Sequence, residues 1–228
     1  MATRSAQGAA TRLRMIQAAA DLFHKQGVHA TSPDDVIEAS NTGKSQFYHY
    51  FKNKEGLVHE VLQTHLEAIR TDTAPFKYEI ESWEDLERWF MAQVEMQKRF
   101  RMTRGCPFGT IGNEVTENDE LIRQDLSLIF EVIKGKLAAF FIKEKAKRAT
   151  PPGADAEALA DFCIAAVQGA MLMGKIKRSS RLVETMIGEA LSHVRRSALA
   201  NAPRAAPPTE HTERISRDAN QARARAKS

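Results

Sequence analysis

The sequence predicts an all-α fold. Apolar residues recur at the three- and four-residue spacing of helices along most of the 228 residues. A serine followed three residues later by an acid, the pattern of a capping box, occurs at Ser32–Asp35 and again at Ser82–Asp85. No hairpin dipeptide lies between alternating apolar runs, so strands are not expected. With 43% apolar residues, the chain can bury a core.

The first helix is expected to end before Gly27, a residue type that often follows a helix. Residues 1–8 are small and polar, and we expect a flexible N-terminus there. An apolar stripe then follows at helical spacing: Leu13, Ile16, Ala20 and Phe23.

Two short helices joined by a tight polar turn are predicted next. Ser32 is placed as the N-cap of the first, with Pro33 at its first position. The turn is Ser40-Asn41-Thr42-Gly43, and the second helix runs to Phe51. This arrangement is a helix-turn-helix, whose second helix enters the major groove of DNA.

The two faces of the second helix differ sharply. Phe47, Tyr50 and Phe51 share one face at helical spacing and are expected to point inward. The opposite face carries hydrogen-bonding and cationic groups, namely Ser45, Tyr48, His49 and Lys52. No acid occurs from Thr42 to Lys54, and a donor-rich surface without carboxylates suits a polyanion such as DNA.

Residues 9–60 resemble the DNA-binding domain of the TetR family of bacterial transcription regulators. The resemblance rests on four segments: Ala18-Ala19-Ala20-Asp21-Leu22-Phe23, Gly27 with Thr31-Ser32, Gly43-Lys44-Ser45-Gln46-Phe47-Tyr48-His49-Tyr50-Phe51, and Lys54-Glu55-Gly56-Leu57. Asn41 stands where the family usually has a turn glycine, and asparagine tolerates the left-handed conformation. The resemblance implies a ligand-responsive repressor that binds a palindromic operator as a homodimer and is not an enzyme.

We therefore expect a helix-turn-helix domain over residues 9–54 with two kinds of DNA contact. Base readout is assigned to Ser45, Gln46 and His49, with Gln46 able to pair bidentately with adenine. The remaining expected contacts, chiefly to the DNA backbone, are Ser32, Thr42, Gly43, Lys44, Tyr48, Tyr50 and Lys54.

A larger helical effector-binding and dimerisation domain is expected over residues 55–200. Its helices are predicted from Lys54 to about Thr73, from Ser82 to Phe100, from a Thr116–Asp119 cap to Phe141, and over about 155–177 and 180–198. Thr150-Pro151-Pro152-Gly153 is a predicted loop, and residues 201–228 a disordered basic tail. Helix four links the DNA surface to the body, and the resemblance implies that an effector acts through its tilt.

The last two helices carry apolar stripes interleaved with small residues. The stripes are Leu159, Phe162, Cys163, Ala166, Val167, Ala170, Met171 and Gly174, then Leu182, Met186, Ile187, Ala190, Leu191 and Val194. The family resemblance implies a homodimer through residues 155–198. The alternative is that both stripes pack against the chain's own core.

Several aromatic and sulfur-containing residues are either core or the lining of an effector cavity: Trp89, Met96, Phe100, Cys106, Phe108 and Phe130. Cys106 precedes Pro107 at a helix start, where the helix dipole can lower a thiol pKa. The alternatives are a redox- or electrophile-sensing thiol and a small residue packed in a helix junction. Cys163 is expected in the core.

Charge and motifs exclude several other classes. Residues 1–54 carry seven Lys/Arg against four Asp/Glu, and residues 201–228 carry six against three, so the positive charge lies at the ends. The seven histidines show no metal-ligand spacing, and we expect neither a metal nor a cofactor. No nucleophile elbow or phosphate-binding loop supports an enzyme. A non-specific nucleoid binder remains a rival, distinguished by its indifference to DNA sequence.

A cytoplasmic location is expected. The segment Met1 to Arg14 has no apolar run typical of a signal peptide. The longest apolar stretch, Phe162 to Gly174, is too short to span a bilayer.

Overall fold

A computed structural model of the chain describes residues 2–147 and 155–199. Within those residues the structure consists of nine α-helices and no strand, which confirms the predicted all-α fold. The helices are α1 (Ala2–Gln26), α2 (Pro33–Ala39), α3 (Lys44–Phe51), α4 (Lys54–Arg70), α5 (Trp83–Arg99), α6 (Pro107–Gly112), α7 (Glu120–Ala146), α8 (Ala156–Lys177) and α9 (Ser180–Leu199). The predicted loop at 150–153 and the tail at 201–228 lie outside the described residues.

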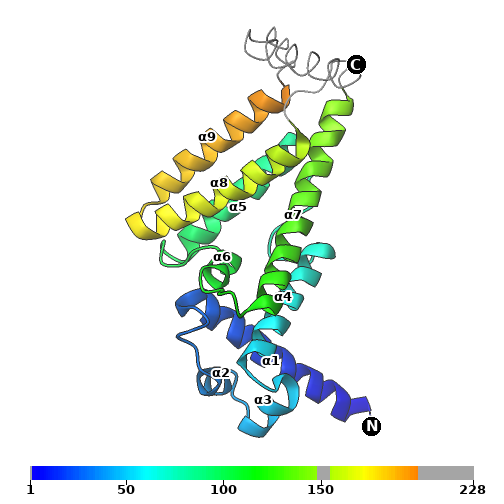
Figure 1. Cartoon of the computed structure of the whole chain (residues 1–228), viewed down its shortest axis with the longest axis vertical. Helices are drawn as coiled ribbons and strands as arrows, with labels where there is room; N and C mark the ends of the chain where they lie inside the picture. Colours follow the sequence, from blue (N-terminus) through cyan, green and yellow to red (C-terminus); the bar gives the residue numbers. More distant parts are fainter. Residues whose placement is uncertain (1, 148–154, 200–228) are drawn as a thin grey trace, which may run out of the picture.

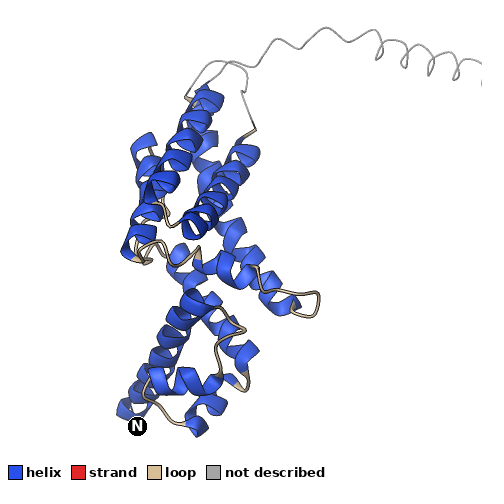
Figure 2. Ribbon diagram, turned by 90° about the vertical axis from the view of Figure 1, so that its left-hand side faces the viewer, coloured by secondary structure: helices blue, strands red, loops and turns tan. Residues whose placement is uncertain are grey.

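The molecule is elongated, with α1–α3 at one end and α5, α8 and α9 toward the other (Figure 1). We call α1–α3 the head and α5–α9 the body. Helix α4 starts beside α3 and packs along α7, so it belongs to both parts. The same division is visible from the side, where helices make up most of the coloured backbone (Figure 2).

Helix α1 differs from the prediction at both its start and its apolar face. It begins at Ala2, so residues expected to be flexible are helical, because no proline or turn signal interrupts them. Met15, Ile16, Ala19 and Phe23 are its buried apolar residues, whereas Leu13 is 46% exposed. The core-facing stripe is thus rotated from the predicted one.

Helix α7 starts later than the capping pattern predicted. The expected pair does form, since the backbone N and Oγ1 of Thr116 donate to Asp119 Oδ2 at 2.9 and 2.6 Å. These bonds close a turn, and the helix begins only at Glu120. The prediction that Thr116 caps this helix was wrong because the same bonds also stabilise an isolated turn.

Helix α8 is, within the described residues, the only one long and apolar enough to cross a bilayer by length and composition. The stretch from Phe162 to Gly174, taken from the sequence as too short to span a bilayer, covers only part of this helix. One face of α8 packs against α7 and α9, burying Leu159, Cys163, Val167 and Met171. This pattern is typical of a core helix.

Candidate DNA interface and effector cavity

The first short helix of the predicted helix-turn-helix is capped at its start as the sequence indicated. Ser32 N donates to Asp35 Oδ2 at 2.7 Å, and Asp35 N donates to Ser32 Oγ at 3.1 Å, which completes the capping box. Pro33 occupies the first helical position. Ser32 itself is exposed, so it and the first turn of α2 face solvent.

In the turn that follows, polar side chains form hydrogen bonds with each other and with the end of α2. Ser40 Oγ lies 2.6 Å from Val36 O and 2.7 Å from Thr42 Oγ1. Asn41 has a φ of +49°, the left-handed conformation that asparagine tolerates better than most residues. Thr42 is half-buried by these contacts, whereas Gly43 is exposed.

Helix α3 has an aromatic anchor beneath an exposed polar surface. Phe47 and Phe51 are buried, with ring centroids 5.5 Å apart. Tyr50, predicted both to point inward and to contact DNA, is half-buried, and its hydroxyl lies close to Gly8 of α1. The exposed residues of α3, here called the recognition face, are Lys44, Ser45, Gln46, Tyr48 and His49.

Gln46 has a local role that the sequence analysis missed. Its Oε1 accepts a hydrogen bond from the backbone N of Gly43 at 3.0 Å, which caps the start of α3. Glutamine at the third helical position is a known partner in capping boxes, so the spacing could have revealed this role. In this conformation only its Nε2 is free, and bidentate adenine readout would require Oε1 to leave the cap.

The two lysines predicted to contact DNA differ in how strongly they interact with the rest of the protein. Lys44 is exposed and forms a solvent-facing ion pair with Asp34 at 3.4 Å, an arrangement that stabilises little. Lys54 is half-buried, and its Nζ donates to Val28 O at 3.0 Å. Lys44 is therefore available to a phosphate, whereas Lys54 also ties the start of α4 to the loop after α1.

The six residues proposed to line an effector cavity do line a single cavity. Its volume is about 550 Å³, within the range of small-molecule sites. Helices α1, α4, α5, α6, α7 and α8 and the segment before α5 form its wall. Trp89, Met96, Phe100, Cys106, Phe108 and Phe130 are all in that wall.

Sequence reasoning missed most of the polar wall of this cavity. The neutral polar residues in it are His24, His65, Tyr78, Gln93 and Gln168. His65 lies among the buried apolar residues of α4, and a polar residue at helical spacing within such a stripe was the available signal. His24 Nε2 lies 2.8 Å from Gly105 O, so it carries the proton and donates. Burial lowers the pKa of both histidines.

Burial, more than the helix dipole, determines the state of Cys106, which favours the alternative of a small residue packed in a helix junction. Burial raises the pKa of its thiol, and this effect exceeds the opposing hydrogen bonds from Gly109, Gln168 and Phe108. Cys106 therefore carries a protonated thiol in the wall of the cavity. Cys163 is fully buried, as expected of a core residue.

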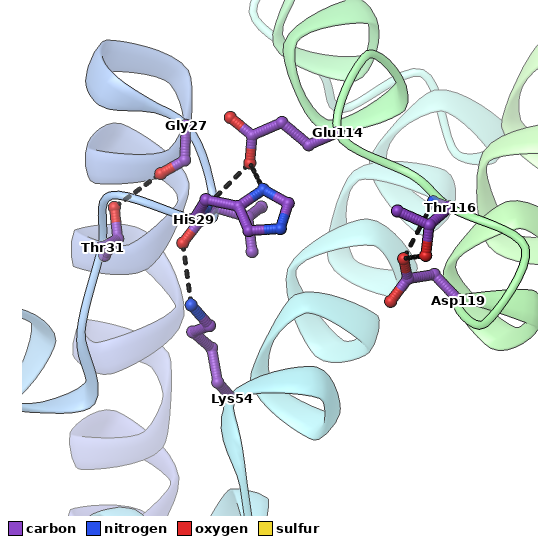
Figure 3. Close-up of polar contacts among 8 residues, drawn as sticks. Gly27, His29, Thr31, Lys54, Glu114, Thr116 and Asp119 are labelled. Carbon is purple, nitrogen blue, oxygen red and sulfur yellow. Dashed lines mark hydrogen bonds and ion pairs between the residues drawn. The ribbon is translucent and has the colours of Figure 1, made fainter.

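Glu114, which follows α6, holds the loop between α1 and α2 (Figure 3). Its Oε2 accepts from the backbone N of His29 at 2.8 Å and lies 3.0 Å from His29 Nδ1. Gly27 has a φ of +90°, a conformation that L side chains rarely adopt, and a β-carbon there would also collide with Glu114 Oε1. The backbone conformation and the close approach together favour glycine at position 27. Because α6 also lines the cavity, this contact connects the cavity wall to the head.

Helix α4 is attached to its neighbours by further polar contacts. His59 Nδ1 lies 2.6 Å from Asp125 Oδ2, and Gln63 Nε2 donates to Asp125 Oδ1 at 2.7 Å, which joins α4 to α7. Arg12 of α1 forms an ion pair with Glu60. Helix α4 is thus attached to the head and the body along its length.

The predicted apolar stripes of α8 and α9 are mostly internal. Leu159, Val167, Ile187 and Val194 are buried within the chain. A different apolar set of α8 faces solvent: Phe162, Leu172, Met173 and Ile176. Phe162 is the only residue common to both sets, so the alternative of internal packing holds for most of the residues named.

No group of three metal-binding side chains occurs within residues 2–147 and 155–199. The fold and the exposed helix-turn-helix define the class of protein as a helix-turn-helix transcription regulator. Residues 15–61 match the family described as bacterial regulatory proteins, tetR family, and residues 83–189 match the tetracyclin repressor-like C-terminal domain. The chain belongs to the TetR family, whose members are transcriptional regulators.

Similar proteins are spread over several bacteria. An uncharacterized HTH-type transcriptional regulator of Lactococcus lactis subsp. lactis is 24% identical over 191 residues, covering 77% of this chain and 88% of the relative. The HTH-type transcriptional repressor DhaR of Mycobacterium sp. (strain GP1) is 25% identical over 185 residues, covering 79% and 91%.

Solved structures share the fold. A regulatory protein TetR from Rhodobacter sphaeroides superposes with a TM-score of 0.69 at 22% identity, covering 79% of this chain and 97% of that chain. A TetR-family regulator from Agrobacterium tumefaciens gives 0.71 at 18% identity, covering 82% and 98%.

Proposed function

We propose that this protein is a ligand-responsive repressor that binds a palindromic operator as a homodimer in the bacterial cytoplasm. The observation that carries the proposal is the recognition face of α3, solvent-exposed and free of acids from Thr42 to Lys54, held by buried Phe47 and Phe51. Such a surface suits the major groove. Repression, in particular, is supported by the similarity to the repressor DhaR.

The residue roles follow from exposure and hydrogen-bonding capacity. Ser45, His49 and the free Nε2 of Gln46 read base edges. Contacts to the DNA backbone come from the first turns of α2 and α3 and from neighbouring side chains: Ser32, Thr42, Gly43, Lys44, Tyr48, Tyr50 and Lys54. The roles of Tyr50 and Lys54 are the most constrained, because both are half-buried and Lys54 already donates to Val28 O.

Selection of bound duplexes from a random DNA pool tests the operator proposal. We expect enrichment of a two-fold symmetric sequence, because two recognition helices related by a dyad read two half-sites. His49→Ala should relax the preference at one position of each half-site. A pool that shows no enriched sequence, although the protein retains it at low salt, would support the non-specific rival instead.

Dimerisation is assigned to residues 155–198, through the face of α8 that remains exposed and the adjoining face of α9. Ile176 is 61% exposed, and β-carbons built at Gly169 and Gly188 meet nothing within 4 Å among the described residues. Small residues on an open face allow helices of a second chain to approach closely. The combined change Leu172→Lys and Ile176→Lys should therefore yield a monomer in sedimentation equilibrium. Met91→Lys, on the exposed side of α5, is the matched control and should leave a dimer.

The cavity is assigned to a small-molecule effector, and two routes connect it to the head. Helix α4 contributes His65, Ala68 and Ile69 to the wall and starts beside α3. Helix α6 contributes Phe108, and the residue Glu114 beyond its end binds the loop that precedes α2. A ligand that favours one position of these helices would shift the population of head orientations that fit the operator.

A further inference from the structure

The charged side chains that line the effector cavity lie where it meets solvent. They are Asp21, Glu95, Arg99 and Arg104, and all except Arg104 are exposed. Arg104 is bound to Asp21 at 2.6 Å, and its guanidinium carbon lies 4.2 Å from the centre of the Phe100 ring. Glu95 pairs with Lys98 at 3.0 Å. Among the described residues, Arg104 is the one charged side chain of this wall that is mostly buried, and Asp21 neutralises it, while the other three face solvent.

Every titratable group of the interior is held in its neutral form. Burial lowers the pKa of His24 and His65 and raises the pKa of Tyr78 and Cys106. At neutral pH both imidazoles are uncharged, and the phenol and thiol keep their protons. The interior thus offers hydrogen bonds but no counter-ion to a buried cation or anion.

Two hydrogen-bonding groups of the cavity wall have no hydrogen-bond partner among the described residues. Within residues 2–147 and 155–199, His65 makes no side-chain hydrogen bond, and its ring stands edge-on to Phe108 at 5.4 Å between centroids. The indole Nε1 of Trp89 is buried with no acceptor in the same part of the chain. A neutral imidazole offers one donor and one acceptor, and an indole offers one donor.

We infer that the cavity binds an uncharged, largely apolar molecule that carries a hydrogen-bond acceptor such as a carbonyl, and that it rejects molecules with a formal charge in their buried part. The inference rests on the proposed role of the cavity as the effector site. Its physical basis is that an ion leaving water for this interior would lose its hydration and gain no opposite charge. A carbonyl compound loses far less and can accept from the neutral donors.

Three compounds with the same two benzyl groups test the inference on the full chain. They are 1,3-diphenylacetone, which is uncharged, dibenzyldimethylammonium, and dibenzylphosphinate. The charge is central in each ion, so it cannot reach the solvent-facing charges of the wall without exposing a ring. Isothermal titration calorimetry at pH 7.5 should give saturable binding of the ketone and at least about tenfold weaker binding of both ions, a difference of about 1.4 kcal/mol. Equal or tighter binding of either ion, or no binding of the ketone, overturns the inference.

Variants on two different helices of the cavity wall test where the ketone binds. Ala92→Phe on α5 and Ala68→Leu on α4 enlarge half-buried alanines of the cavity wall and should each weaken ketone binding at least tenfold. Ala139→Phe on the exposed side of α7 is the matched control and should bind the ketone like the parent chain. Circular dichroism shows whether each variant folds. If one wall variant does not fold, ketone binding by the other wall variant tests the assignment. Ketone binding unaffected by a folded wall variant contradicts the assignment.

This experiment and the operator selection fail independently. If an operator is recovered but the cavity prefers an ion, the ligand class is wrong and the regulator proposal stands. If the ketone binds in the cavity but no duplex sequence is enriched, the regulator proposal is wrong and the ligand class stands.

Discussion

The head and the body place their polar groups in opposite ways. On α3 the hydrogen-bonding side chains are outside and hydrated, and aromatic side chains support them from within. In the body, polar side chains line a cavity that opens to solvent, and burial favours the neutral form of its histidines. The head is therefore suited to a charged partner met in water, and the cavity to an uncharged one taken out of water.

The largest expected effect comes from removing the support of the recognition face. Phe47→Ala should lower the free energy of unfolding by about 3–5 kcal/mol, because a fully buried ring leaves a cavity. DNA binding should be lost with it. Tyr48→Ala, at the adjacent 47% exposed position, should weaken DNA binding while thermal unfolding stays unchanged. A stable Phe47→Ala variant with normal DNA binding would refute the role of the anchor.

Substitutions at Gln46 can separate its capping of α3 from its proposed contact with DNA. Gln46→Glu keeps an oxygen that can accept from Gly43 N, so helix stability should be retained. The new carboxylate should nevertheless weaken operator binding by at least roughly 1–3 kcal/mol, the range for a lost base contact. Gln46→Ala should lose both the cap and the contact. Fluorescence anisotropy on operator variants and chemical unfolding measure the two effects separately, and undiminished binding by Gln46→Glu would exclude a DNA contact there.

The contact between the head and the body can be tested at Gly27. Gly27→Ala should lower the unfolding free energy by roughly 1–2 kcal/mol, because it combines a left-handed backbone with a collision against Glu114. Adding Glu114→Ala should recover part of this loss by removing the collision. A double-mutant cycle by urea unfolding gives the interaction energy. Strict additivity of the two changes would show that the close approach is absent in solution.

A weaker effect is expected in the pH dependence of the free energy of unfolding, through two histidines of the cavity wall. His24 and His65 have lowered pKa values in the folded chain, so below pH 6.5 the unfolded chain takes up protons that the folded chain does not. Stability should therefore fall on acidification from pH 6.5 to 5.5, by at most about 1.4 kcal/mol per histidine. The variant His65→Gln should show a shallower dependence in pH-dependent urea unfolding. An unchanged slope would mean that His65 titrates normally when folded.

Most of the helices, the helix-turn-helix and the inward aromatic pair Phe47 and Phe51 could be predicted from the sequence. These features depend on periodicity and capping among residues a few positions apart, which the sequence displays directly. The family resemblance supplied the six residues of the cavity wall as one of two alternatives. The sequence pattern could not distinguish core from cavity lining, because an aromatic residue at helical spacing is compatible with both.

Which side chains contact one another across the fold became known only from the packing of the helices. Glu114 meets His29 across 85 positions of sequence, and His65 faces the cavity because α4, α6 and α7 converge there. The same packing determined that burial, more than the helix dipole, controls the Cys106 thiol, and which face of α8 stays exposed. Desolvation and long-range contact are properties of packed neighbours, so no local pattern encodes them.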